Sequence, residues 1–186
     1  MTNDTELTFE LETDLERVIA AQPRWQAGIE WGRPRHGHPE GIVKLHVAAV
    51  LANVDRLFAA DSCRGQLRLI ALIHDTFKSE VNTDQPRTGE NHHGMRARRF
   101  AEPLISDEQV LDVIELHDHA YNAWQRGNIG GDWTAAERRA SALVTRLGGA
   151  VDLYVRFYRC DNETEGKKQA CFLWFRDFVE SRSNVK

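Results

Sequence analysis

The sequence predicts an all-α fold, a single domain of about seven helices. Apolar residues recur at intervals of three and four along most of the chain, which is the spacing of one face of an α-helix. No segment alternates apolar and polar residues as a half-buried strand does. The length of 186 residues suits one domain with a substantial core, so we expect residues 1–186 to fold as one unit.

Capping residues and helix breakers divide this pattern into elements. Loops are expected at residues 24–40, 79–91 and 126–132, and Pro103 breaks a short helix over 92–104. The main helices are expected at residues 7–21, 40–60, 62–75, 106–124, 134–149, 150–162 and 167–181. Their N-caps are expected at Ser62, at Ser106 or Asp107, and at Thr134.

The composition is that of an ordinary globular protein, with a formal net charge of −4. A general nucleic-acid-binding surface normally carries a basic excess, so nucleic acid is not an expected partner, although a local basic pocket for phosphate is compatible with this balance. Three cysteines without CxxC spacing suggest reduced thiols. No segment has the roughly 18 apolar residues that span a bilayer, and the acidic N-terminus does not resemble a signal peptide. We therefore expect a cytoplasmic protein without a membrane partner.

Periodicity separates the histidines into two kinds. In a helix, residues three, four and seven apart share a face. Four of the eight histidines share a face with apolar residues: His46, His74, His93 and His117. Two neighbours differ, because His92 shares its face with Arg96 and Arg99, and His119 shares its face with Glu115. Both neighbours are expected to face water.

The four histidines on apolar faces are expected to converge on a metal ion. A single histidine in such a place is more often a hydrogen-bonded core residue than a ligand. However, each buried polar group left unpaired costs about 1–3 kcal/mol, and one small domain seldom satisfies four of them separately. Shared ligation would satisfy them together. Imidazoles mixed with carboxylates suit a divalent ion such as Mn²⁺, Mg²⁺, Co²⁺, Ni²⁺, Fe²⁺ or Zn²⁺.

Helix faces also sort the carboxylates. Asp161 shares a face with Tyr154 and is expected to be buried. Asp152 lies four residues before Arg156, a spacing that favours an exposed ion pair. Asp75 directly follows one of the four histidines at an expected helix end, where the terminating backbone lets both side chains turn inward. Asp75 and Asp161 are therefore the candidate carboxylate ligands.

Three motifs carry a resemblance to a known family. They are "HPEGIVKLH" at 38–46, "LIALIHDTFK" at 69–78 and "RRASALVTRLGGAVDLYVRFYRCDN" at 138–162. In this order they resemble the HD-domain superfamily of metal-dependent phosphohydrolases, and in detail the HD domain of bacterial CCA-adding tRNA nucleotidyltransferases. The resemblance covers about residues 36–163, with the N- and C-terminal helices expected to pack on that core. No nucleotidyltransferase segment precedes it, so a stand-alone HD domain is expected and tRNA end repair is not implied.

The resemblance implies a divalent metal with these ligands: His46, His74, Asp75 and Asp161. His93 and His117 match two further histidines of many relatives, which hold a second metal or contact phosphate. Lys78 matches a lysine that follows the His-Asp pair and would hold substrate phosphate. Catalytic roles are therefore expected for Asp75, Lys78, His93 and His117. Phe77 stands where relatives usually carry a small residue, which predicts an altered pocket floor.

Other residues are weaker candidates for substrate binding. Arg35 precedes the first ligand helix, and Arg87 lies in the loop after Lys78; for both, an ordinary solvated loop residue is the alternative. Tyr121 and Trp124 could stack a base, although an aromatic pair at helical spacing more often packs in a core.

The expected function is metal-dependent hydrolysis of a phosphomonoester or phosphodiester, such as a nucleotide. The expected partner is therefore a small phosphorylated molecule. One alternative is a non-hydrolytic nucleotide-sensing or interaction module, and another is an HD-type di-iron oxygenase. The sequence leaves open whether one or two metal ions bind. Its amphipathic terminal helices could pack between two copies of the chain, so a homodimer is a further expectation.

Overall fold

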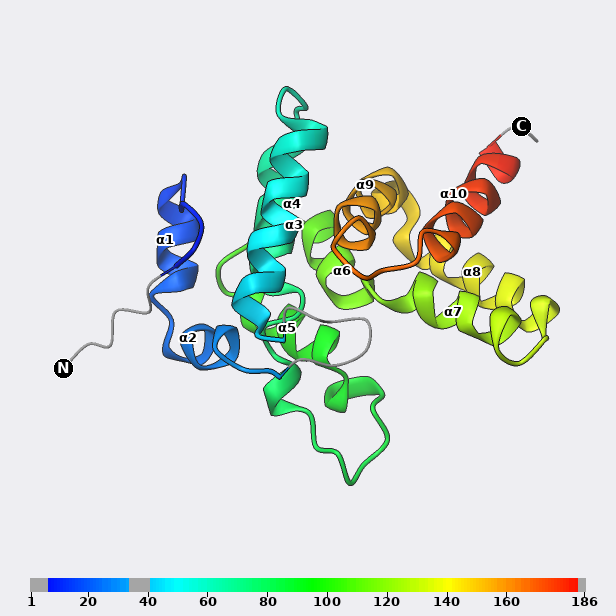
Figure 1. Cartoon of the computed structure of the whole chain (residues 1–186), viewed down its shortest axis with the longest axis horizontal. Helices are drawn as coiled ribbons and strands as arrows, with labels where there is room; N and C mark the ends of the chain where they lie inside the picture. The colour runs from blue at the N-terminus through cyan, green and yellow to red at the C-terminus, as the bar shows by residue number, and fades with distance from the viewer. Residues whose placement is uncertain (1–6, 34–40, 184–186) are drawn as a thin grey trace.

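The computed structural model describes residues 7–33 and 41–183. These residues form α-helices, short 3-10 segments and one isolated bridge between Gly32 and Ile42, without a strand, so the predicted all-α class is confirmed (Figure 1). The α-helices are α1 (Asp14–Ala20), α2 (Pro23–Ile29), α3 (Val43–Phe58), α4 (Arg64–Ile73), α5 (His93–Ala101), α6 (Glu108–Leu116), α7 (His119–Asn128), α8 (Trp133–Leu147), α9 (Val151–Asn162) and α10 (Ala170–Ser183). The 3-10 segments are Lys78–Glu80, Gly89–Asn91 and Gly148–Ala150. Among the described helices, none combines the length and the apolar character needed to cross a membrane.

Helix α4 lies at the centre of the packing. It contacts α3, α6 and α9, and Figure 1 shows α3 and α4 side by side. Leu67, Ile70 and Ile73 on this helix are fully buried. Burial of each such side chain stabilises the fold by about 1.5–3 kcal/mol. The apolar run therefore fixes the place of the two residues that follow it, His74 and Asp75.

The remaining helices extend the bundle on both sides of this centre. Helices α1 and α2 lie on one side of α3 and α4, and α7, α8 and α10 lie on the other (Figure 1). Helices α7 and α8 pack against each other, and α10 packs against both. One hydrophobic cluster includes buried residues from α1 through α10.

The expected loop over residues 24–40 was wrong for its first part, because α2 begins at Pro23. Proline is favoured at the first position of a helix, where its missing N–H has no partner to lose. Trp25 and Ile29 on α2 are buried, and the Trp25 indole donates a hydrogen bond to the Leu72 carbonyl at 2.8 Å. Residues 34–40, which include Arg35, lie outside the described residues.

The expected single helix over 106–124 was also wrong, because the chain turns between α6 and α7. His117 and Asp118 occupy this turn. The Tyr154 hydroxyl lies within 3.1 Å of the carbonyls of Leu116 and His117 and of the Ala120 amide. These contacts satisfy backbone groups that would otherwise be orphaned at the two helix ends. Together with α2 and the short helix α5, this division explains why ten α-helices are described where about seven were expected.

Capping residues agree only in part with expectation. The Asp107 side chain accepts hydrogen bonds from the backbone at the start of α6, so the second of the two proposed caps is confirmed. Helix α8 is capped by Asp132 instead of Thr134. Cys63 instead of Ser62 precedes α4, and its side chain makes no capping hydrogen bond.

A buried ion pair holds α1 against α4. Arg68 on α4 donates to the Glu16 carboxylate at 2.8 Å, and both side chains are buried. Glu16 also completes a capping box with Thr13 at the start of α1. Removing one partner of a buried pair leaves an uncompensated charge, so the two side chains depend on each other.

Gly28 allows α2 to approach the turn that follows α4. A Cβ atom on Gly28 would lie 1.9 Å from the Thr76 carbonyl oxygen, closer than any side chain allows. The Thr76 hydroxyl in turn donates to the Leu72 carbonyl at 2.9 Å. Helix α2 therefore packs closely against the turn that carries His74 and Asp75 and supports it.

We expect Gly28→Ala to lower the free energy of unfolding by about 1–3 kcal/mol, because the backbone of the turn must move. Gly65→Ala is the matched control, since a Cβ atom at this α4 position meets nothing within 4 Å. It should be neutral or stabilise the fold by up to about 1 kcal/mol. Urea unfolding followed by circular dichroism measures both, and equal stability of the two variants would contradict this packing.

Candidate metal centre

Two His-Asp pairs end two helices in the same way. His74 follows α4 and His117 follows α6, both with helical backbone angles. The Nδ1 atom of His74 lies 3.0 Å from the Ala71 carbonyl, and Nδ1 of His117 lies 2.9 Å from the Ile114 carbonyl. A carbonyl only accepts, so Nδ1 carries a proton, and each ring in its neutral form presents the Nε2 lone pair. Hydrogen bonds of this kind orient histidine ligands in metal sites.

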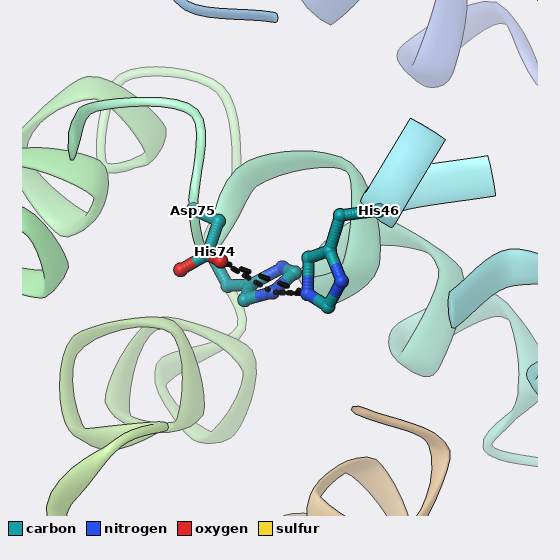
Figure 2. A group of neighbouring side chains, drawn as sticks. All are labelled: His46, His74 and Asp75. Carbon is teal, nitrogen blue, oxygen red and sulfur yellow. Dashed lines mark hydrogen bonds and ion pairs between the residues drawn. The ribbon is translucent and has the colours of Figure 1, made fainter. Parts of the chain in front are cut away.

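The first group of ligand atoms comes from α3 and the end of α4. Nε2 of His46 lies 3.3 Å from Nε2 of His74, and Oδ2 of Asp75 lies 3.6 Å from each (Figure 2). All three side chains are buried. From the last turn of α9, Oδ1 of Asp161 lies 2.9 Å from Nε2 of His46. Imidazoles and carboxylates therefore converge at a single point in the core.

The second group lies on the opposite side of the same carboxylate. Nε2 of His93, at the start of α5, lies 3.0 Å from Nε2 of His117. Oδ1 of Asp75 lies 3.2 Å from Nε2 of His117 and 3.6 Å from Nε2 of His93. This oxygen is buried and makes no hydrogen bond to any residue in the described part of the chain. It is an orphaned acceptor of the kind that a cation satisfies.

Asp75 therefore bridges two pairs of imidazoles, one on each carboxylate oxygen. The set fits divalent metal ions, since all of these side chains except the partly exposed His93 are buried and the ligand atoms within each group lie within 4.8 Å of one another. The sequence predicted these ligands on separate helix faces, and the fold brings together all of His46, His74, Asp75, His93 and His117. The buried His/Asp groups could hold a metal ion.

Gly94 makes the second group possible. A Cβ atom on Gly94 would lie 2.2 Å from the Glu115 carbonyl oxygen. Only a glycine lets the first turn of α5 come this close to the end of α6. The close approach brings His93 to His117.

Two lysines neutralise the two aspartates. Lys78 donates a hydrogen bond to Oδ2 of Asp75, and Lys167 donates to Oδ1 of Asp161 at 2.6 Å. Lys78 was predicted to lie at the site. Lys167 was missed, because it belongs to the segment between α9 and α10 and has no helical periodicity. Its only sequence signal is its position six residues after Asp161.

Burial keeps two of the imidazoles neutral. It lowers the pKa of His74 to about 3. Burial, helped by the nearby charge of His117, holds the pKa of His93 well below its usual range. His117 differs, because its contact with Asp75 and the charge of Asp118 outweigh burial and raise its pKa. Among His74, His93 and His117, His117 is thus the imidazole that most readily carries a second proton.

The carboxylates stay ionised in spite of burial. Burial alone would raise the pKa of Asp75, but the Lys78 ammonium and the His74 ring hold it well below its usual range. Burial likewise opposes the charge of Asp161, and Lys167 together with His46 outweighs it and lowers the pKa. Neutral imidazoles and ionised carboxylates are the forms that bind metals.

The predicted distinction between two carboxylates of α9 is confirmed. The Asp161 side chain is 15% exposed and faces the first group, whereas the Asp152 side chain is 79% exposed and pairs with Arg156. Helical periodicity alone was enough to separate them.

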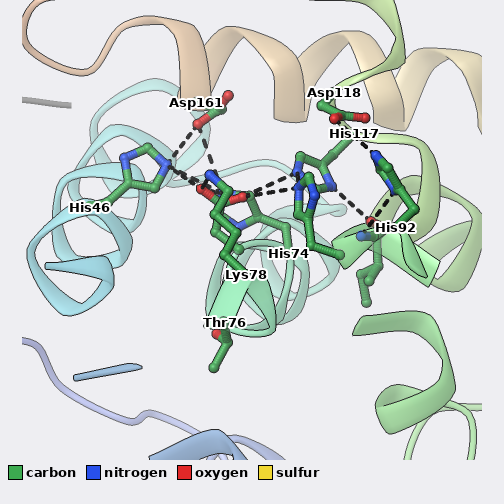
Figure 3. Close-up of polar contacts among 12 residues, drawn as sticks. His46, His74, Thr76, Lys78, His92, His117, Asp118 and Asp161 are labelled. Atoms are coloured by element: carbon green, nitrogen blue, oxygen red, sulfur yellow. Dashed lines mark hydrogen bonds and ion pairs between the residues drawn. The ribbon is translucent and has the colours of Figure 1, made fainter. Parts of the chain in front are cut away.

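The expectation that His92 faces water was wrong. His92 is the N-cap of α5 with an extended backbone, so helical periodicity does not apply to it. Its Nδ1 accepts from the Gly94 amide at 3.2 Å, and its Nε2 lies 3.1 Å from Oδ2 of Asp118. Asp118 also accepts from Nδ1 of His119, whose side chain remains 42% exposed. His92, His93 and Asp118 form a third, half-buried group beside the second (Figure 3).

The remaining predicted residues have separate places. Phe77 is fully buried, with its ring centre 4.7 Å from that of Phe100 and the Arg24 guanidinium over its face. Trp124 is buried, and Tyr121 is exposed beside it. Arg87 is exposed and lines a cavity that also includes His92.

No protein-family model, curated protein or solved structure gives a match to this chain. The chemistry of the site must therefore be argued from its own residues.

We expect Tyr154→Phe to lower the free energy of unfolding by about 1–3 kcal/mol. The change leaves backbone groups of Leu116, His117 and Ala120 without their buried partner. Tyr121→Phe is the control, because Tyr121 is 42% exposed and its hydroxyl contacts only Gln125 among the described residues. Urea unfolding compares the two, and a loss for Tyr121→Phe as large as that for Tyr154→Phe would contradict the role of this hydroxyl.

Proposed function

We propose that the chain is a metal-dependent phosphohydrolase of the HD-domain type, acting on a small phosphomonoester or phosphodiester such as a nucleotide. The single observation that carries the proposal is the Asp75 carboxylate between two pairs of imidazoles. Its Oδ2 faces His46 and His74, and its Oδ1 faces His93 and His117. A purely structural role accounts poorly for so many buried groups with convergent lone pairs.

In this proposal, His46, His74, Asp75 and Asp161 would hold a first ion, and Asp75, His93 and His117 would hold a second. Divalent ions held there would supply a water of lowered pKa and positive charge beside a phosphoryl oxygen. The ligand set of nitrogen and oxygen atoms without thiolate suits Mn²⁺, Fe²⁺, Co²⁺, Ni²⁺, Zn²⁺ or Mg²⁺.

Lys78 and His117 have further roles in the proposal. The Lys78 ammonium lies against Asp75 with 19% of its side chain exposed, so it can exchange that contact for a substrate phosphate. If only the first ion binds, the raised pKa of His117 favours a protonated ring that donates to phosphate. The lowered pKa of His93 argues against the same role for that ring.

The test is metal analysis of protein purified without chelator, followed by a phosphatase screen with added Mn²⁺, Mg²⁺, Co²⁺ or Ni²⁺. We expect bound metal and hydrolysis of a phosphate ester that a chelator abolishes. Bound metal without hydrolysis of any ester, together with tight nucleotide binding, would favour a sensor. Two irons per chain with oxygen consumption would favour an oxygenase.

We expect Asp161→Ala to remove most of the metal bound by the first group, because Asp161 lies 2.9 Å from Nε2 of His46. Asp152→Ala is the matched control on the same helix and should retain the wild-type metal content, since Asp152 is exposed. The metal content per chain of the two variants is measured by mass spectrometry and compared with that of the wild type. The reverse pattern would overturn the ligand assignment.

We expect Lys78→Met to lower kcat/KM for a phosphate ester by about a hundredfold or more while metal content stays unchanged. The lysine contacts a ligand of the metal without being one itself. Lys44→Met serves as the control, because Lys44 on α3 pairs with Glu30 on the surface. Equal rates for the two variants would remove Lys78 from the mechanism.

A further inference from the structure

A basic cavity lies beside the third His-Asp group. It has a volume of about 670 Å³, within the range of small-molecule sites. Residues from the segment before α5 and from α5, α6, α7 and α8 line it. The side chains that matter here are Arg87, Arg126, Arg139, Arg146, His92 and His119.

The charges of this cavity do not balance. Glu115 is the acidic residue among its described lining residues, and it already accepts a hydrogen bond from Arg146. For Arg87, Arg126 and Arg139, no carboxylate within residues 7–33 and 41–183 lies at ion-pair distance. By contrast, Arg98 on the neighbouring α5 bonds to three carboxylates. In a chain of net charge −4, three guanidinium groups around one cavity, without an ion-pair partner in the described part of the chain, favour an anionic ligand.

The imidazole rings of His92 and His93 lie between this cavity and the candidate metal centre. His92 lines the cavity, and its ring centre lies 4.5 Å from that of His93. His93 in turn faces Oδ1 of Asp75 at 3.6 Å. Figure 3 shows the polar contacts of His46 with Asp161 and His74, and, beside His117, the contact of His92 with Asp118. The cavity therefore adjoins the candidate metal centre across the rings of His92 and His93.

We propose that this cavity is a second phosphate subsite, and that the substrate of the metal centre carries two phosphate groups on one small molecule. One phosphoryl group would lie at the metal centre, and the other would be held by Arg87, Arg126 and Arg139. Guanidinium groups match phosphate in both geometry and charge, because each offers parallel N–H donors. The inference rests on the proposed function, since it names the substrate class of the same centre.

Titration of inorganic pyrophosphate into the protein as purified tests the cavity through the arginines that line it. We expect Arg126→Gln with Arg139→Gln to weaken binding at least tenfold. Arg138→Gln should bind as the wild type does, because Arg138 is adjacent on α8 and also exposed but does not line this cavity. Unchanged metal content and circular dichroism would show that the double variant is folded. Equal affinities in all three proteins would overturn the subsite.

A comparison of adenosine monophosphate with adenosine 3′,5′-bisphosphate tests whether the phosphate held in the cavity belongs to the same molecule as the phosphate at the metal centre. The readout is the dissociation constant, or kcat/KM where the compound is hydrolysed. We expect the wild type to prefer the bisphosphate at least tenfold and the double variant to lose this preference. Arginine-dependent binding of pyrophosphate without any preference for the bisphosphate would mean that the cavity takes a free anion, which contradicts the proposal.

These measurements can contradict the second subsite without contradicting the proposed function, and the reverse also holds. If no phosphate ester is hydrolysed with any metal, the hydrolase proposal falls, whereas the arginine-dependent affinities can still be measured. If hydrolysis occurs but Arg126 and Arg139 do not affect substrate preference, the hydrolase proposal stands and the second subsite falls.

Discussion

The structure depends on one buried carboxylate and on how its charge is satisfied. Asp75 is 4% exposed and lies among four imidazoles and a lysine. An ionised carboxylate in such a place is costly unless it is paired on both oxygens. Lys78 and the first pair of imidazoles face Oδ2, whereas Oδ1 faces only imidazoles and makes no hydrogen bond to the described residues. A cation bound at each oxygen would satisfy the whole set, and the proposed chemistry follows from that requirement.

Much of the surrounding fold serves to hold this arrangement. The apolar body of α4 fixes one His-Asp turn, and Gly28 and Trp25 of α2 support it from behind. Tyr154 of α9 holds the other turn, and Gly94 admits α5 to it. Since the two turns share the same backbone geometry and the same Nδ1 hydrogen bond, each presents Nε2 to the same carboxylate. Positioning by packed helices is more precise than positioning by loops.

Helical periodicity predicted most of the candidate ligand residues from the sequence. It placed His46, His74, His93, His117 and Asp161 on inward faces, because each is part of a helix or directly ends one. It failed where the chain leaves a helix. His92 is a cap, Lys167 is in a connecting segment, and the turn at His117 divides a stretch that has an unbroken apolar pattern. The third group and the basic cavity depend on these tertiary contacts, which no single helix face can indicate.

The central proposal is that the Asp75 carboxylate would help to hold a divalent ion on each of its two sides. Anomalous diffraction from crystals grown with Mn²⁺ tests it most directly, because it locates each ion without reference to activity. The account predicts two anomalous peaks, one between Asp75, His46 and His74 and the other between Asp75, His93 and His117. Peaks elsewhere, or no peak within bonding distance of the Asp75 carboxylate, would contradict it.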